Sequence, residues 1–181
     1  MIIVMGLPGA GKSTVLRGAA TEDTKVLNYG TLMFEIAKEK FGISNRDEIR
    51  KLPLSQQKEV QAEVAERLSG EEGRVVLDTH CSIKTPKGYL PGLPFALLSK
   101  LEVEALVLIT AHPTEVYTRR KNDPTRNRTD DLTERDIHEH DSINRALLAA
   151  YAAQRGCPAK IIYNAQGKVE EASAELRSIL E

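Results

Sequence analysis

The segment "GLPGAGKST", Gly6–Thr14, constrains more than any other what this chain can fold into. It completes the pattern G-x-x-x-x-G-K-[S/T], follows a short apolar run and precedes a helical pattern. In that context the glycines let backbone N–H groups surround a phosphate, and the helix start adds partial positive charge. The sequence therefore predicts a P-loop that binds a nucleoside triphosphate. The predicted ATP-binding residues are Gly6, Leu7, Pro8, Gly9, Ala10, Gly11, Lys12, Ser13 and Thr14.

Three side chains in and near this pattern predict a magnesium nucleotide. Lys12 can reach the β- and γ-phosphates, and the Ser13 hydroxyl can bind Mg²⁺. Asp78 ends the apolar run "RVVLD" and is expected to be a Walker-B carboxylate, bound to the metal directly or through water. The string N-K-x-D, with which a GTPase reads its base, is absent from the sequence. ATP with Mg²⁺ is therefore the expected ligand.

Short β-branched runs alternate with amphipathic stretches of helix length, which is typical of a parallel sheet covered by helices on both faces. The predicted strands are Ile2–Met5, Lys25–Asn28, Arg74–Asp78, Ala105–Thr110 and Ala159–Tyr163. The predicted helices are Lys12–Ala20, Thr31–Lys40, Leu54–Leu68, Pro94–Leu101, Pro113–Lys121, Thr133–Gln154 and Lys168–Leu180. Ligands of such α/β sheets bind at the carboxyl ends of the strands.

Two intervals break this alternation. Residues 29–73 hold two or three helical patterns where one would connect the strands, which is the size of a small helical subdomain. The segment "RRKNDPTRNR", 119–128, gathers five cations around a proline in a chain whose net charge is −1. A solvated loop is the plain interpretation. Beside a P-loop we favour a lid that closes over phosphates, because phosphoryl transfer needs charge neutralisation and exclusion of water.

The chain resembles the archaeal-type adenylate kinases, within the P-loop nucleoside monophosphate kinases. The resemblance covers nearly the whole chain and is carried by the P-loop, "NYGTLMFEIAKE", "RDEIRKL", "DTHCSIKTPKGYLPGLP", "DPTRNR" and "HEHDSINRA". It implies an α/β P-loop NTPase fold with a five-stranded parallel sheet, a helical NMP-binding insert and a short lid. The implied reaction is ATP + AMP ⇌ 2 ADP with Mg²⁺, in a homotrimer. The implied single domain spans 1–181, with its core at 1–28, 74–121 and 132–181, the insert at about 29–73 and the lid at about 122–131.

The resemblance, together with the charge and position of individual residues, suggests their roles. The expected catalytic residues are Lys12, Arg120, Arg126, Arg128 and Arg145. The expected AMP-binding residues are Tyr29, Gly30, Thr31, Arg46, Arg50, His80 and Lys84. Two acceptor-site arginines of bacterial relatives are unmatched. Phe34 stands at one position, and the other lies in a "GFPR" segment that this chain replaces by Thr79, His80 and Cys81. Arg46 and Arg50, together with Lys84 or Lys87, are the candidates to replace them.

Some residues suggest chemistry that their spacing does not support. His138 and His140 lie two positions apart on a predicted helix, so their rings point about 200° apart and cannot share one metal ion. His80 either orients the acceptor or packs at the end of its strand. Cys81 and Cys157 are expected to be reduced thiols without a catalytic role. We interpret Thr85–Pro94, rich in proline and glycine, as a rigid loop against the acceptor site.

Composition narrows the partners, and two alternatives remain open. A net charge of −1 and an aromatic content of 4% argue against nucleic-acid and membrane binding. The chain shows no targeting segment, so we expect a cytoplasmic protein whose partners are ATP, AMP and ADP. One alternative is a kinase for another small acceptor, such as a cytidine or uridine monophosphate or shikimate. The other is an adenylate-kinase-like, nucleotide-gated interaction module.

Overall fold

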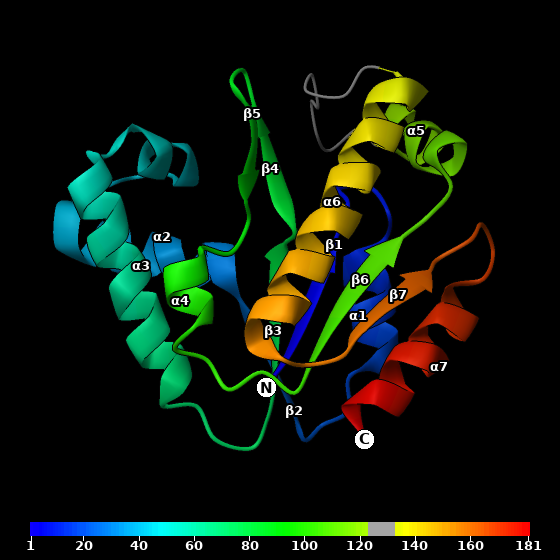
Figure 1. Cartoon of the computed structure of the whole chain (residues 1–181), viewed down its shortest axis with the longest axis horizontal. Helices are drawn as coiled ribbons and strands as arrows, with labels where there is room; N and C mark the ends of the chain where they lie inside the picture. The colour runs from blue at the N-terminus through cyan, green and yellow to red at the C-terminus, as the bar shows by residue number, and fades with distance from the viewer. Residues whose placement is uncertain (123–132) are drawn as a thin grey trace.

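A five-stranded parallel sheet forms the centre of the protein (Figure 1). The computed structural model describes residues 1–122 and 133–181. The strands lie in the order β2, β3, β1, β6, β7, and each neighbouring pair is parallel. Their bounds are β1 Ile2–Gly6, β2 Thr24–Asn28, β3 Arg74–His80, β6 Ala105–Thr110 and β7 Ala159–Tyr163. The predicted parallel sheet is confirmed, and the strand that leads into the P-loop is its central one.

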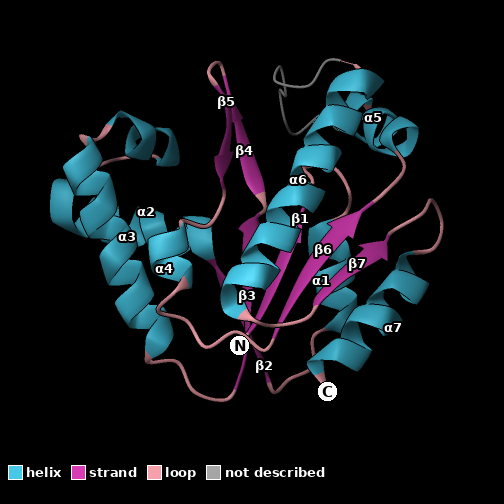
Figure 2. Cartoon of the chain, in the orientation of Figure 1, coloured by secondary structure: helices cyan, strands magenta, loops and turns pink. Residues whose placement is uncertain are grey.

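Helices cover both faces of this sheet (Figure 2). Their bounds are α1 Lys12–Ala19, α2 Tyr29–Phe41, α3 Leu54–Ser69, α4 Phe95–Leu98, α5 Pro113–Lys121, α6 Glu134–Arg155 and α7 Val169–Leu180, with a 3-10 helix η1 at Arg46–Lys51. Side chains alternate along β1 because successive strand residues point to opposite faces. Ile2 and Val4 pack in the cluster formed with α1 and α7, whereas Ile3 and Met5 pack with α2, α3, α4 and α6.

The longest helix, α6, is fixed at both ends by local interactions that its sequence encodes. The side chain of Thr133 accepts a hydrogen bond from the backbone N–H of Asp136, and the Asp136 carboxylate accepts one from the N–H of Thr133. This capping box satisfies N–H groups that the first turn leaves unpaired. At the other end Gly156 adopts a left-handed conformation with φ 65°, which ends the helix at Arg155.

The prediction of a loop at Thr85–Pro94 is wrong for half of that stretch, because Thr85 and Gly88–Pro91 lie in strands. The structure forms an antiparallel hairpin of β4 Ser82–Thr85 and β5 Gly88–Pro91, which stands apart from the main sheet. The Thr85 hydroxyl donates to the carbonyl of Gly88 at 2.8 Å and so closes the turn. Prolines are tolerated because they lie in the turn and at a strand end, where no ladder hydrogen bond is lost. The helix predicted at Pro94–Leu101 is correspondingly short, Phe95–Leu98.

The irregular interval at 29–73 contains α2, η1 and α3, so the expected two or three helices are present. Asn28 caps α2: its side chain accepts a hydrogen bond from the backbone N–H of Thr31 at 3.0 Å. Salt bridges of 2.8 Å join Lys40 on α2 to Glu59 and Glu63 on α3. Among the helices of the described ranges, none is long and apolar enough to cross a membrane.

Candidate active site

The P-loop leaves the central strand at Gly6 and enters α1 at Lys12. Gly9 and Gly11 have φ of 89° and 84°, a left-handed conformation that side chains disfavour. Gly11 also has no room for a side chain, because a Cβ there would lie only 2.3 Å from Nδ2 of Asn164. Strand, loop and helix therefore follow one another as predicted, with glycine where the backbone requires it.

Asp78 lies beside the P-loop lysine. β3 pairs with β1 so that Asp78 is level with Val4, and the Asp78 carboxylate forms a salt bridge with the Lys12 ammonium. Each of these two side chains is only 13% exposed. Burial lowers the pKa of Lys12 from its ordinary value to about 8, whereas the Asp78 carboxylate favours the charged ammonium and opposes that change. The sequence-predicted Lys12 and Asp78 thus meet at the carboxyl edge of the sheet.

The residues predicted to hold Mg²⁺ have the chemistry that this ion prefers. Asp78 supplies a carboxylate from the end of β3, and Ser13 supplies a hydroxyl from the first turn of α1. Mg²⁺ takes oxygen ligands and keeps several waters, so it binds through one or two protein groups together with substrate phosphates. Groups of three or more His, Cys, Asp or Glu side chains able to hold a metal by themselves do not occur in the described ranges. The pair Ser13 and Asp78 fits Mg²⁺ that arrives with a nucleotide.

A chain of contacts runs from Asp78 to the predicted acceptor side. Asn28 donates from Nδ2 to Oδ2 of Asp78 at 2.9 Å. Its Oδ1 accepts a hydrogen bond from the Thr31 hydroxyl at 3.1 Å, and the Arg46 guanidinium donates to the same hydroxyl. The expected AMP-binding residues Thr31 and Arg46 are therefore connected to Lys12 through Asn28 and Asp78.

The other expected acceptor residues are less closely grouped. Tyr29 is 8% exposed and packs in the core, while Gly30 lies near Arg46, whose Nη1 would be 3.7 Å from a Cβ there. Arg50 is exposed on η1, and His80 is exposed at the end of β3. The Lys84 ammonium, on the hairpin, lies 3.4 Å from the Asp136 carboxylate of α6.

Two of the clustered cations hold the P-loop itself. Arg120 donates from Nε to the carbonyl of Pro8 at 2.8 Å, and Arg119 donates from Nη1 to the carbonyl of Ala10 at 3.3 Å. Both side chains come from the last turn of α5. Arg126 and Arg128, predicted for the lid, lie outside the described residues. The guanidiniums of Arg119 and Arg120 thus contact the loop that is expected to bind the triphosphate.

Arg145, expected to be catalytic, lies on α6 beside the end of β7. It donates to the Asp141 carboxylate at 2.7 Å and to the Tyr163 hydroxyl at 2.9 Å, and its guanidinium lies 5.4 Å from the centre of the Tyr163 ring. Asp141 is 7% exposed and accepts a second hydrogen bond from Thr110 at 2.6 Å. The described contacts of Arg145 therefore run to Asp141 and Tyr163.

The two histidines of "HEH" have different surroundings. His138 is exposed on α6. His140 is 3% exposed: its Nε2 lies 3.0 Å from the Ser82 hydroxyl, and its ring centre lies 5.0 Å from that of Tyr89. The Ser82 hydroxyl also donates to Asn144 at 2.5 Å. His140 thus takes part in packing the hairpin against α6.

Sequence reasoning missed three residues that organise this edge of the sheet: Asn28, Asp141 and Asn164. Asn28 ends β2, and Asn164 follows β7 directly. A signal was present, because the runs "KVLN" and "IIYN" each end in an asparagine at the carboxyl end of a strand. Ligands of parallel sheets bind at that edge.

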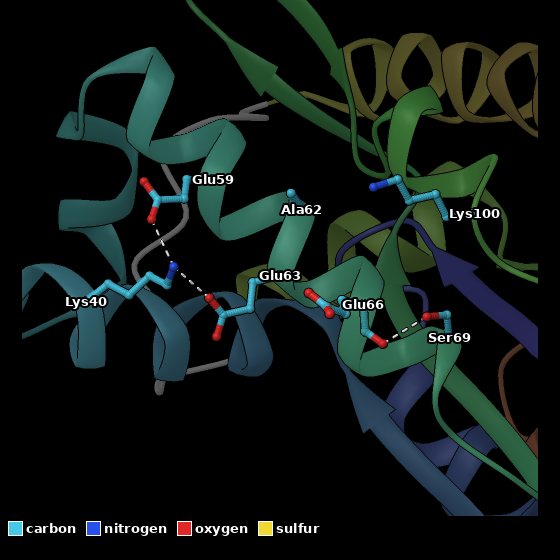
Figure 3. Close-up of a pocket in the computed structure, with 7 residues that line it drawn as sticks. All are labelled: Lys40, Glu59, Ala62, Glu63, Glu66, Ser69 and Lys100. Atoms are coloured by element: carbon cyan, nitrogen blue, oxygen red, sulfur yellow. Dashed lines mark hydrogen bonds and ion pairs between the residues drawn. The ribbon is translucent and has the colours of Figure 1, made fainter.

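A separate pocket of about 390 Å³ lies between α2, α3 and Lys100 (Figure 3). Its lining includes the Lys40 ammonium, paired with Glu59 and Glu63. None of the predicted site residues lines it. We therefore place the candidate site at the P-loop and not in this pocket.

The fold and the P-loop together define a class, the P-loop nucleotide-binding kinases. A family model described as an AAA domain matches residues 5–138. The shikimate kinase from Acinetobacter baumannii in complex with shikimate has a TM-score of 0.58 at 19% identity, covering 99% of this chain and 91% of that one. The shikimate kinase from Bacteroides thetaiotaomicron gives 0.57 at 18% identity, covering 99% and 97%. At such identities the likeness is one of fold alone.

Sequence relatives decide the family within that class. The adenylate kinase of Methanothermobacter thermautotrophicus is 42% identical over 185 residues, covering 100% of this chain and 99% of the relative. That of Thermoplasma acidophilum is 43% identical over 179 residues, covering 98% and 97%. That of Methanocaldococcus jannaschii is 40% identical over 188 residues, covering 99% and 97%. The chain belongs to the adenylate kinase family, as its sequence motifs predicted.

Proposed function

We propose that the protein is an adenylate kinase, which transfers a phosphoryl group reversibly between ATP and AMP to form two ADP and so balances the adenine nucleotides. One observation carries the proposal beyond the family. The contact chain from Lys12 through Asp78, Asn28 and Thr31 connects the P-loop to Arg46. A phosphate-binding loop joined to a second cation suits transfer between two phosphorylated substrates.

In this proposal the P-loop N–H groups and Lys12 bind the donor phosphates. Arg46, Arg50 and Lys84 bind the acceptor phosphate, and Gly30, Thr31 and His80 line its site. An oxygen of the AMP phosphate attacks the γ-phosphorus, the bond to the β–γ bridging oxygen breaks, and ADP leaves, so no covalent enzyme intermediate is needed. Mg²⁺, when bound by Ser13 and Asp78, would neutralise charge on the phosphate oxygens.

Arginines complete the proposed site. Arg126 and Arg128 are proposed to close over the phosphates, because planar guanidinium groups pair bidentately with phosphate oxygens. Arg120 and Arg145 are proposed to stabilise the transferred group in the closed state. The division into a core, an NMP-binding insert at about 29–73 and a lid at about 122–131 is part of the same proposal, as are a cytoplasmic location and a homotrimer.

The first experiment needs only ADP. The purified protein with Mg²⁺ and ADP should form ATP and AMP in equal amounts, measured by luciferase and by chromatography. EDTA should abolish the reaction, and Lys12→Ala, as the matched control, should reduce it strongly. Folded protein that forms no ATP would contradict the proposal and favour the nucleotide-gated interaction module.

A second experiment addresses the acceptor. Initial rates with ATP and each of AMP, CMP, GMP, UMP and shikimate should be highest with AMP. A higher kcat/KM with another acceptor would assign the chain to a different small-molecule kinase activity.

Light scattering coupled to size exclusion chromatography tests the homotrimer, for which a mass of three chains is expected.

A further inference from the structure

Three side chains donate hydrogen bonds to two carbonyl groups of the P-loop. The carbonyl oxygen of Ala10 accepts one hydrogen bond from Nδ2 of Asn164 at 2.8 Å and a second from Nη1 of Arg119 at 3.3 Å. The carbonyl oxygen of Pro8 accepts from Nε of Arg120 at 2.8 Å. These donors come from α5 and from the residue after β7, far from the P-loop in sequence. The orientation of the loop is therefore set by tertiary contacts.

Fixing a carbonyl also fixes the N–H of the next residue. In a planar trans peptide the C=O of one residue and the N–H of the following one point in opposite directions. Holding the Ala10 carbonyl turns the N–H of Gly11 away from Asn164, and holding the Pro8 carbonyl turns the N–H of Gly9 away from Arg120. In the part of the chain that the structure describes, neither N–H has a backbone acceptor. Both are in place to donate to an anion.

Of these three donor residues, Asn164 is buried and is also held by hydrogen bonds of its own backbone. It is 5% exposed, its backbone N–H donates to the carbonyl of Thr110 at 2.8 Å, and its own carbonyl accepts from Nη2 of Arg119 at 3.0 Å. Its amide packs directly on the loop, since a Cβ on Gly11 would be only 2.3 Å from Nδ2. Asn164 thus connects the P-loop to the end of β6 and to α5.

We infer that Asn164 is a positioning residue for the donor triphosphate: its amide holds the Ala10 carbonyl outward, so that the N–H of Gly11 faces the phosphates before a nucleotide binds. The inference rests on the proposed function, because it specifies how the donor site is organised. Donors that are oriented in advance need no rearrangement when the anion arrives, which favours binding and transfer. Asn164 acts through the loop and needs no contact with the nucleotide.

Calorimetric titration with tripolyphosphate, which lacks the adenosine, tests this role directly. Asn164→Ala should weaken binding of tripolyphosphate and of MgATP by the same factor, about 3- to 10-fold for one lost hydrogen bond. The KM for AMP should stay unchanged. Asn164→Asp keeps the size of the side chain but turns a carboxylate oxygen toward the Ala10 carbonyl, so it should weaken both ligands further.

A matched control separates positioning from stability. Leu176→Ala removes a fully buried side chain of α7 that packs away from the loop, so it should lower the melting temperature and leave tripolyphosphate binding unchanged. Tripolyphosphate binding by a folded Asn164→Ala or Asn164→Asp chain within twofold of the parent would overturn the inference. A parent chain that binds neither MgATP nor tripolyphosphate would overturn the proposed function itself, and the two failures are therefore distinct.

Discussion

Substitution of Gly11 by alanine isolates the physical requirement of the P-loop. Gly11 has φ 84°, and its added Cβ would lie 2.3 Å from the buried amide of Asn164. The left-handed backbone costs a side chain about 1–2 kcal/mol. Displacing the amide removes its hydrogen bond to Ala10, which adds about 0.5–1.5 kcal/mol. We expect Gly11→Ala to lose about 1.5–3.5 kcal/mol of unfolding free energy, taking these two ranges together.

Gly156→Ala supplies the matched control. Gly156 also has a positive φ, 65°, but nothing lies within 4 Å of the position of its Cβ. That variant should therefore lose the backbone contribution alone, about 1–2 kcal/mol. Urea unfolding followed by circular dichroism measures both losses. For a chain of this size each kcal/mol corresponds to about 2–4 °C in the melting temperature.

The comparison of the two variants decides the argument. Gly11→Ala should be the less stable by about 0.5–1.5 kcal/mol, and it should also lose affinity for MgATP, whereas Gly156→Ala should keep that affinity. If Gly11→Ala proves as stable as Gly156→Ala and binds MgATP normally, then close packing of Asn164 on the loop does not hold in solution.

Four further predictions concern other parts of the molecule. Lys12→Ala should lower kcat on the order of 100-fold or more, because a preorganised charge at the phosphates is lost; steady-state kinetics retaining half the activity would contradict its placement. Asp141→Ala should lower the unfolding free energy by about 1–3 kcal/mol, since it strands two hydrogen-bonding partners, and an unchanged urea midpoint would oppose this. Burial raises the pKa of Cys81 to about 12. At pH 8 a disulfide reagent should therefore react only with Cys157, which is partly exposed, until urea unfolds the chain. Equal reaction rates of both thiols in the folded protein would be inconsistent with the fold. Gly92→Ala should yield little folded protein, because its Cβ would lie 1.9 Å from a backbone carbonyl oxygen at the end of β3; a melting temperature within a few degrees of the parent would show that the hairpin base can shift.

Local sequence patterns were sufficient for the main sheet. The strands ending at Thr110 and Tyr163 were predicted with the bounds that the structure has, because each is a short run rich in Val, Ile or other residues that favour strands. The hairpin was not predicted. Its strands have four residues each and its sequence contains two prolines, so propensity favoured a loop. Pairing between the two short strands decided its structure.

The candidate site divides in the same way. The P-loop is a local pattern, so its nine residues could be identified from sequence spacing alone. Asn164 could not, because it meets Ala10 across 154 positions of the chain and only the fold brings them together. Arg120 was expected at the phosphates through its charge. Its hydrogen bond to the carbonyl of Pro8 depends on where α5 ends.

In the proposed enzyme, the contact chain between Lys12 and Arg46 joins the donor and acceptor sites. A donor phosphate that draws Lys12 from Asp78 frees the carboxylate that holds Asn28, and an acceptor phosphate that draws Arg46 from Thr31 acts on Asn28 from the other side. Free energies of binding are state functions. If one nucleotide changes the affinity for the other by some factor, the second must therefore change the affinity for the first by the same factor. In the proposed function, the side-chain amide of Asn28 at the end of β2 is therefore the group through which a nucleotide in one site would alter the affinity of the other site.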